Sequence, residues 1–327
     1  MASFASASRA QTLSVLPRDR PHAHPIWVQA SKILSFHGLS GSQTRFGKLD
    51  WIGGLELSSD DPLFGGFSGL AFLDAEHFIA VGDKGAALSG RLVFEQGKPV
   101  DVRETAIRYL PGLGKAQRDW QRDAEGLAVR SGEAFVSFEG IVRLTRYRLK
   151  DFGFARLEGK QRLPALIEEA NQANEGLEAL AIAPEGSPYN GAFILLSEKV
   201  RQGRVLGWIY EPGQVRTFDL PQSDGLSVTD AAFTQQGDLI ILERKVSLLG
   251  GLEIQLRRIR RSDFRPGPIE QTDVLMRGNL AYALDNMEGL DIQGLPDGDN
   301  VVSLISDDNF SALQRTLLLQ FLLSRDQ

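Results

Sequence analysis

The chain has 327 residues, is 42% hydrophobic and 24% charged, and carries a net charge of −6, a composition typical of a globular protein with a large core. The acidic balance provides no basic surface for a nucleic-acid backbone, so we expect no nucleic-acid partner. The absence of cysteine excludes disulfides, thiolate nucleophiles and cysteine-based zinc sites, and four histidines provide little material for a histidine metal site.

The N-terminal residues 1–25 are rich in Ser, Ala, Arg and Pro and lack the apolar segment of a secretory signal. We interpret them as a disordered or leader-like segment that precedes one domain over residues 26–327. No apolar run in the sequence approaches the roughly 18–20 residues that span a bilayer, so we expect no transmembrane segment.

A short phrase of the type acid-Gly-Leu-Ala recurs along the chain at steps of 50 to 58 residues. It predicts the first strand of a repeated unit at 68–72, 125–129, 175–182, 229–233 and 288–292. After a turn, each copy is followed by a second apolar run that ends in or near an acid, at 76–83, 133–139, 191–198, 237–244 and 300–309. Further strands with alternating polarity follow, which is typical of the outer part of a sheet.

Five such units predict an all-β fold, a β-propeller of five four-stranded blades. The last apolar run, 316–323, leaves the fifth blade one strand short, and we expect the segment 46–57 to complete it by pairing the two ends of the chain. A partial sixth blade that includes 27–36 is the alternative. A β-sandwich would give no reason for the second strand of each unit to end near an acid.

Antiparallel pairing places the start of each first strand beside the end of the second, so the acids of all units should meet at one mouth of the central channel. The first strands contribute Glu125, Glu175, Asp230 and Glu288 to this predicted ring. The second strands contribute Asp83, Glu139, Glu198, Glu243, Asp307 and Asp308. Crowded carboxylates either take up protons or bind cations, and oxygen ligands without His or Cys suit Ca²⁺ or Mg²⁺.

Neutral and cationic side chains beside these acids suggest a substrate site. The amides of Asn174, Asn286 and Asn309 offer neutral oxygens, and Arg244 and Arg315 can orient an anionic group. The structural alternative is that acids at blade corners accept hydrogen bonds from the main chain of the next loop and fix the packing of the blades.

Six phrases of the sequence resemble the esterase-like phytase family, which carries the phytase-like domain. They are FGGFSGLAF at 64–72, DAEGLA at 123–128, NEGLEALA at 174–181, LER at 242–244, DNMEGL at 285–290 and SDDNFSALQRTLLLQF at 306–321. The resemblance implies a β-propeller, an association with phosphoester or ester hydrolysis, and a periplasmic or secreted location. Because no signal peptide is visible, a cytoplasmic location is the alternative.

These observations lead to two hypotheses. In the first, the protein is a monomeric, metal-dependent hydrolase of small anionic phosphoesters or esters. Its metal ligands would be Asp83, Glu139, Glu198, Glu243, Asp307 and Asp308. Its catalytic residues would be Glu125, Glu175, Glu288 and Arg244, with Asn174, Asn286, Asn309 and Arg315 as substrate contacts. In the second, the same face is a non-catalytic binding surface for a ligand or a partner protein.

Overall fold

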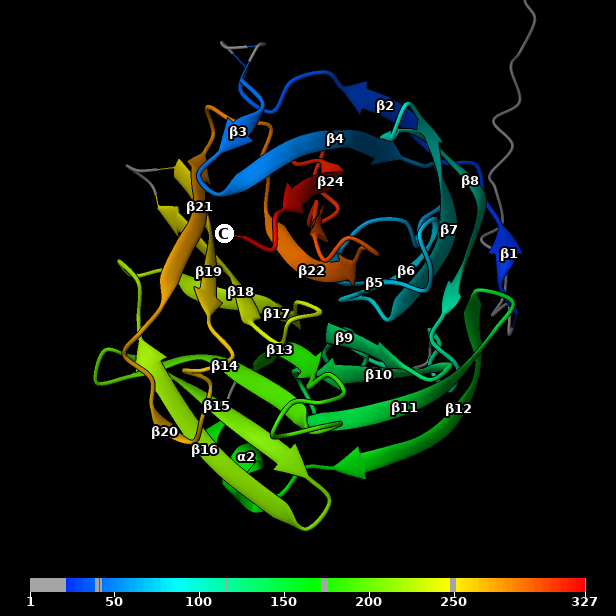
Figure 1. The fold of residues 1–327 in the computed structure, drawn as a ribbon. Coiled ribbons are helices and arrows are strands. Elements are labelled where there is room, and N and C mark those ends of the chain that lie inside the picture. Colours follow the sequence, from blue (N-terminus) through cyan, green and yellow to red (C-terminus); the bar gives the residue numbers. More distant parts are fainter. Residues whose placement is uncertain are drawn as a thin grey trace, which may run out of the picture.

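The computed structural model describes residues 22–38, 41, 43–115, 117–171, 176–247 and 251–326. Five antiparallel sheets are arranged in a ring, so the predicted five-bladed β-propeller is confirmed (Figure 1). The first strands of the blades, β5, β9, β13, β17 and β22, lie nearest to the centre of the ring and each packs against the first strand of the next blade.

Blades 1 to 4 run in chain order from an inner strand to an outer strand. Blade 1 consists of β5 (Phe67–Phe72), β6 (His77–Gly82), β7 (Ala86–Glu95) and β8 (Lys98–Tyr109), with β1 (His24–Pro25) at its outer edge. Blade 2 consists of β9 (Ala124–Arg130), β10 (Glu133–Phe138), β11 (Arg143–Lys150) and β12 (Gly153–Arg162).

Blade 3 contains β13 (Leu177–Ile182), β14 (Phe193–Arg201), β15 (Arg204–Glu211) and β16 (Gln214–Pro221), and the short β20 (Gly267–Pro268) pairs with β16 in parallel. Blade 4 contains β17 (Ser227–Phe233), β18 (Leu239–Ser247), β19 (Gly251–Ile259) and β21 (Asp273–Asn279). Two short helices, α1 (Asp119–Arg122) and α2 (Ala165–Ala170), precede blades 2 and 3. Neither helix of the described chain has the length and apolar character needed to cross a membrane.

Blade 5 joins the two ends of the chain, as predicted. It contains β22 (Met287–Gly294), β23 (Asn300–Ser306), β24 (Thr316–Leu323), β4 (Leu49–Ser58) and β2 (Gln29–Ile33), and β3 (Arg45–Phe46) forms a hairpin with β4. Thr316 pairs with Leu57 and Leu323 pairs with Leu49, so the whole of β24 is covered by β4. The segment before β4 adds a fifth strand to this blade, and the alternative of a partial sixth blade is therefore wrong.

A β-bulge interrupts the pairing of the first and second strands at the same place in every blade. One extra residue of the first strand is inserted there, which bends the strand and turns a side chain out of the ladder. In chain order the bulged residues are Ser68, Glu125 (with Gly126 beside it), Glu178, Thr229 and Glu288. These bulges give the structural alignment of the five repeats.

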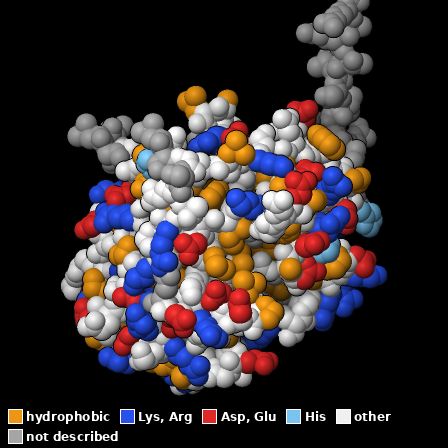
Figure 2. Space-filling view, turned by 45° about the horizontal axis from the view of Figure 1, so that its top comes forward, with side chains coloured by type: hydrophobic (Ala, Val, Ile, Leu, Met, Phe, Trp, Pro, Cys, Tyr) orange, Lys and Arg blue, Asp and Glu red, His pale blue; other side chains and the backbone are white. Residues whose placement is uncertain are grey.

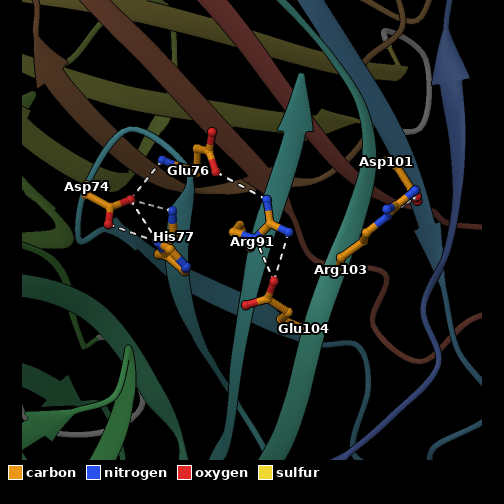
Figure 3. Close-up of polar contacts among 7 residues, drawn as sticks. All are labelled: Asp74, Glu76, His77, Arg91, Asp101, Arg103 and Glu104. Atoms are coloured by element: carbon orange, nitrogen blue, oxygen red, sulfur yellow. Dashed lines mark hydrogen bonds and ion pairs between the residues drawn. The ribbon is translucent and has the colours of Figure 1, made fainter. Parts of the chain in front are cut away.

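Polar contacts stabilise the outer strands of blade 1 (Figure 3). Arg91 of β7 forms ion pairs with Glu76 at 3.2 Å and with Glu104 at 2.8 Å. His77 contacts Asp74 and stacks on the ring of Phe152 from blade 2, with 3.6 Å between the ring centroids. In the space-filling view of Figure 2, charged side chains of both signs are spread over the visible face, and hydrophobic side chains gather in a hollow near its middle.

Candidate functional site

The bulges decide which side chains surround one mouth of the channel. In each blade, the first-strand residue just before the bulge pairs with a residue of the second strand. The next residue along the second strand lies at the mouth. This second-strand position is occupied by Asp83, Glu139, Glu198, Arg244 and Asp307. Together with the bulged residues, they form what we call the carboxylate ring, in which Arg244 replaces an acid and the bulged positions of blades 1 and 4 are the uncharged Ser68 and Thr229.

Three carboxylates of blade 2 come together within this ring. Asp123 directly precedes β9, Glu125 is in the bulge, and Glu139 directly follows β10. One oxygen of each carboxylate lies within 4.8 Å of the others, so this group can hold a metal ion. The backbone N–H of Glu139 donates to the carbonyl oxygen of Asp123 at 3.2 Å and fixes the two ends of the strands relative to each other.

The acids of this triad are perturbed by burial and by each other. Burial and the carboxylate of Glu139 raise the pKa of Asp123 to about 7. Burial, followed by the charge of Glu178, raises the pKa of Glu125 well above its ordinary value. Burial, followed by the charge of Glu198, raises the pKa of Glu178 in the same direction. Glu178 therefore belongs to the carboxylate ring although the sequence pattern did not identify it.

Acids of blades 1 and 5 continue the ring. Burial and the charge of Asp307 raise the pKa of Asp83 to about 7, and burial and the charge of Glu288 raise that of Asp307 to about 7. One carboxylate oxygen of Asp83 is buried and has no hydrogen-bond partner within the described residues. A proton or a cation would satisfy this oxygen, because a buried unpaired acceptor is costly.

Arg244 is the only cation among the ring positions of the described chain, and it is partly neutralised there. Its Nη1 lies 2.8 Å from Oε1 of Glu288 and also donates to the amide oxygen of Asn286. The amide nitrogen of Asn286 donates to Glu288 at 2.8 Å and to Asp307 at 3.3 Å. The structure thus brings together Arg244, Glu288, Asn286 and Asp307, four residues that the sequence analysis assigned to the site, and their roles stay predictions.

Asp308 and Asn309 differ from these residues because their hydrogen bonds involve main-chain N–H groups. Oδ1 of Asp308 accepts the N–H groups of Gly66 and Phe310, each at 3.0 Å, and Oδ2 accepts the hydroxyl of Thr316 at 3.0 Å. This carboxylate thereby links blade 5 to the loop that enters blade 1, which is the structural alternative for a corner acid. Asn309 is exposed, and its backbone N–H donates to Asp307 at 2.6 Å.

The predicted place of Glu243 in the ring is wrong. Its side chain is fully buried inside blade 4, where Gln255 donates to it at 2.8 Å and Arg257 forms an ion pair with it. Successive side chains of a strand point to opposite faces, so a shift of one residue places Arg244 at the mouth and Glu243 inside the sheet.

Asp230 is displaced from the ring for the same reason. The bulge of blade 4 is at Thr229, and the carboxylate of Asp230 accepts the N–H groups of Ala231 at 2.8 Å and of Leu290 at 2.7 Å. Asp230 therefore connects blade 4 to blade 5 inside the channel wall instead of facing the mouth.

Arg315, predicted to contact the substrate, forms its ion pairs with residues outside the ring. Its Nε lies 3.3 Å from Asp285 and its Nη1 lies 3.8 Å from Glu56 on β4. Asn174 and Glu175 lie outside the described residues, so their predicted roles stay predictions.

Sequence reasoning missed Asp123 and Glu178. In blade 3 the phrase Glu-Ala-Leu-Ala, which starts at Glu178, matches the Glu-Gly-Leu-Ala of blade 2. A repeat alignment on the glycine at position 176 is three residues too early, because the equivalent position in blade 3 is Ala179. The acid of Asp-Ala-Glu-Gly two residues before Glu125 was the signal for Asp123.

A family model described as "Phytase-like: Esterase-like activity of phytase" matches residues 62–310. A search of curated proteins finds no match. Among solved structures, the glutaminyl cyclase of Myxococcus xanthus is 13% identical over 80% of this chain and 91% of its own, with a TM-score of 0.43. A candidate 6-phosphogluconolactonase of Bacteroides uniformis is 15% identical over 88% of this chain and 81% of its own, with a TM-score of 0.37. These two similarities provide no basis for assigning an activity.

Proposed function

The chain belongs to the phytase-like family, whose model covers most of its length, and on this premise we propose that it is a metal-dependent hydrolase of ester or phosphoester substrates. The observation that supports the proposal best is the convergence of Asp123, Glu125 and Glu139 at one mouth of the propeller. Three carboxylates without histidine or cysteine match the preference of a hard divalent cation such as Ca²⁺ or Mg²⁺.

A cation held by these carboxylates would polarise the bond to be cleaved and neutralise charge that develops on its oxygen. The raised pKa of Asp123, about 7, supports this assignment, since the group is crowded by negative charge that a cation would relieve. Because protons and the cation compete for the same oxygens, we expect the site to bind metal better above pH 7 than below it.

Glu178 is suited to transfer protons during hydrolysis. Burial and neighbouring acids raise its pKa well above the ordinary value, which makes its carboxylate a stronger base than that of a free glutamate. We assign it the role of general base toward the attacking water. Glu288 holds Arg244 in place, and the guanidinium nitrogens of Arg244 that do not contact Glu288 or Asn286 are available for an anionic substrate group.

Two substitutions test this assignment. We expect Glu125→Gln and Glu178→Gln each to lower metal-stimulated turnover of 4-nitrophenyl phosphate or 4-nitrophenyl esters by about 100-fold or more. The matched control is Glu76→Gln, which changes an exposed acid on the outside of blade 1 (Figure 3). Wild-type protein without turnover of either substrate class in Ca²⁺, Mg²⁺ or Mn²⁺ would contradict the proposal.

The second candidate function is a non-catalytic binding propeller. It is favoured by Asp308 and Glu243, two predicted ligands that instead hold the fold together. Under this alternative, Glu125→Gln would change ligand binding or thermal stability and no reaction would be lost. The small anionic substrate, the monomeric state and the periplasmic or secreted location remain predictions.

A further inference from the structure

A cavity of about 650 Å³ lies beside the metal triad on the side of blade 2. Glu139 belongs both to the triad and to the lining of this cavity, so a molecule that fills the cavity reaches the proposed metal centre. The opposite wall is formed by the end of β12, with Lys160, and by Asn171 after α2. We call this cavity the blade-2 groove.

The blade-2 groove is lined by charged side chains of both signs and by amides, and two of these amides already have a hydrogen-bonded oxygen. The side-chain oxygen of Gln117 accepts the N–H of Gly114 at 2.8 Å, and that of Gln121 accepts the N–H of Arg118 at 2.9 Å. The oxygens of both amides are therefore occupied, and their nitrogens remain for a ligand.

Two nearly buried side chains of the groove have unsatisfied polar atoms. Arg143 is 7% exposed, and its Nε has no hydrogen-bond partner in the described part of the chain. Asn171 is 2% exposed, and the same holds for its Oδ1. Both atoms are covered by the protein, so a molecule in the groove does not contact them. Arg143, which forms no ion pair within the described residues, contributes its positive charge to the groove.

Lys160, like Arg143, is a cation of the groove without an ion pair in the described part of the chain. Its neighbour Arg162 forms an ion pair with Glu168 at 3.5 Å, whereas Lys160 has no ion pair within the described residues. The cations of the groove are complementary to an anionic group of a ligand, and the neighbouring carboxylates are complementary to a metal ion.

We propose that the blade-2 groove binds a second anionic group, a carboxylate or phosphate, carried by the substrate away from its cleaved bond, and that Lys160 determines this specificity. The inference rests on the proposed hydrolase function and adds the substrate class. Lys160 acts on binding and takes no part in bond cleavage, since it lies on the outer strand of blade 2 and not in the carboxylate ring.

The test compares two esters that share a leaving group. Mono-4-nitrophenyl glutarate carries a distal carboxylate, and 4-nitrophenyl butyrate is neutral. We expect Lys160→Met to lower kcat/KM for the glutarate ester about three- to tenfold through KM, with kcat unchanged, and to leave the butyrate ester unaffected. Lys160→Arg should retain the preference. Lys150→Met, which changes a 75% exposed lysine at the other end of blade 2, is the matched control.

Equal effects on both esters, or no effect on either, would overturn the role of Lys160. If the wild-type protein hydrolyses neither ester, calorimetry decides about the groove, and the hydrolase proposal itself fails only if 4-nitrophenyl phosphate is not cleaved either. Glutarate and inorganic phosphate are titrated separately into wild type and Lys160→Met. Binding of either anion that is weakened by the substitution supports the groove and identifies the anion, whereas absent or unchanged binding rejects it.

Discussion

Two adjacent residues of β18 lie in different environments. Glu243 is buried in blade 4 against Arg257, and Arg244 reaches the carboxylate ring and contacts Glu288. The strand alternation alone explains the difference, because each side chain faces the side opposite to its neighbour. The buried pair thus belongs to the structure of blade 4, and the half-buried Arg244 belongs to the site.

The first prediction concerns the buried ion pair of Glu243 and Arg257. Glu243→Ala leaves a guanidinium without its partner in the sheet interior, and we expect it to lower the free energy of unfolding by about 3–5 kcal/mol. Asp101→Ala is the control. It breaks the exposed contact between Asp101 and Arg103 (Figure 3), for which we expect less than about 1 kcal/mol. Urea denaturation measures both. Equal effects of the two substitutions would show that Glu243 is not paired as described.

The first strands of neighbouring blades approach each other closely. A Cβ atom added to Gly126 of β9 would lie 2.7 Å from Cβ and 2.8 Å from the backbone nitrogen of Leu180 on β13. Gly289 of β22 approaches the backbone of β5 in a similar way, with Leu70 N at 3.0 Å. Glycine follows the bulge at these places because the neighbouring first strand leaves no space for a side chain.

The second prediction tests this packing. Gly126→Ala should destabilise the protein by about 1–3 kcal/mol, because the methyl group meets rigid backbone of the next blade. Gly159→Ala on β12 is a suitable control, since nothing lies within 4 Å of the added atom. We expect the control to change stability by less than about 0.5 kcal/mol. Thermal denaturation of the two variants gives the comparison, and tolerance of Gly126→Ala would contradict the close approach of β9 and β13.

At the scale of the whole molecule, the propeller gathers negative charge from four blades into one mouth. Asp83, Asp123 and Asp307 come from blades 1, 2 and 5, and each has a pKa raised to about 7. In the unfolded chain their pKa values are about 3.9. The folded protein therefore binds more protons than the unfolded chain between about pH 4 and pH 7.

The third prediction is a stability that falls as pH rises through this window. Because the folded state holds the extra protons, deprotonation penalises it, and the penalty is complete above about pH 7. In EDTA we expect the melting temperature to be lower at about pH 8 than at about pH 5.5. Millimolar Ca²⁺ should raise the melting temperature at pH 8 and have a smaller effect at pH 5.5. A Ca²⁺ effect that is equal at both pH values, or absent, would argue for acids that bind no cation.

The sequence by itself predicted the architecture because the repeat consists of local patterns of apolar, polar and turn residues. The apolar second strands at 76–83, 133–139 and 300–309 correspond to β6, β10 and β23, and the segment 46–57 contains most of the closing strand β4. Strand alternation and turn residues are properties of neighbouring positions, so they need no tertiary contact to be recognised.

The sequence also determined that acids from several blades meet at one mouth, but only the tertiary structure decided which ones. The bulge in each inner strand sets the register of the first two strands. Glu243 and Asp230 are one residue away from the ring positions and point into the sheets. Glu178 lies three residues after the position that the repeat predicted. A bulge depends on the strand that pairs with it and on the blade behind it, and this information is not local in the chain. The distances among Asp123, Glu125 and Glu139 exist only once the blade has folded.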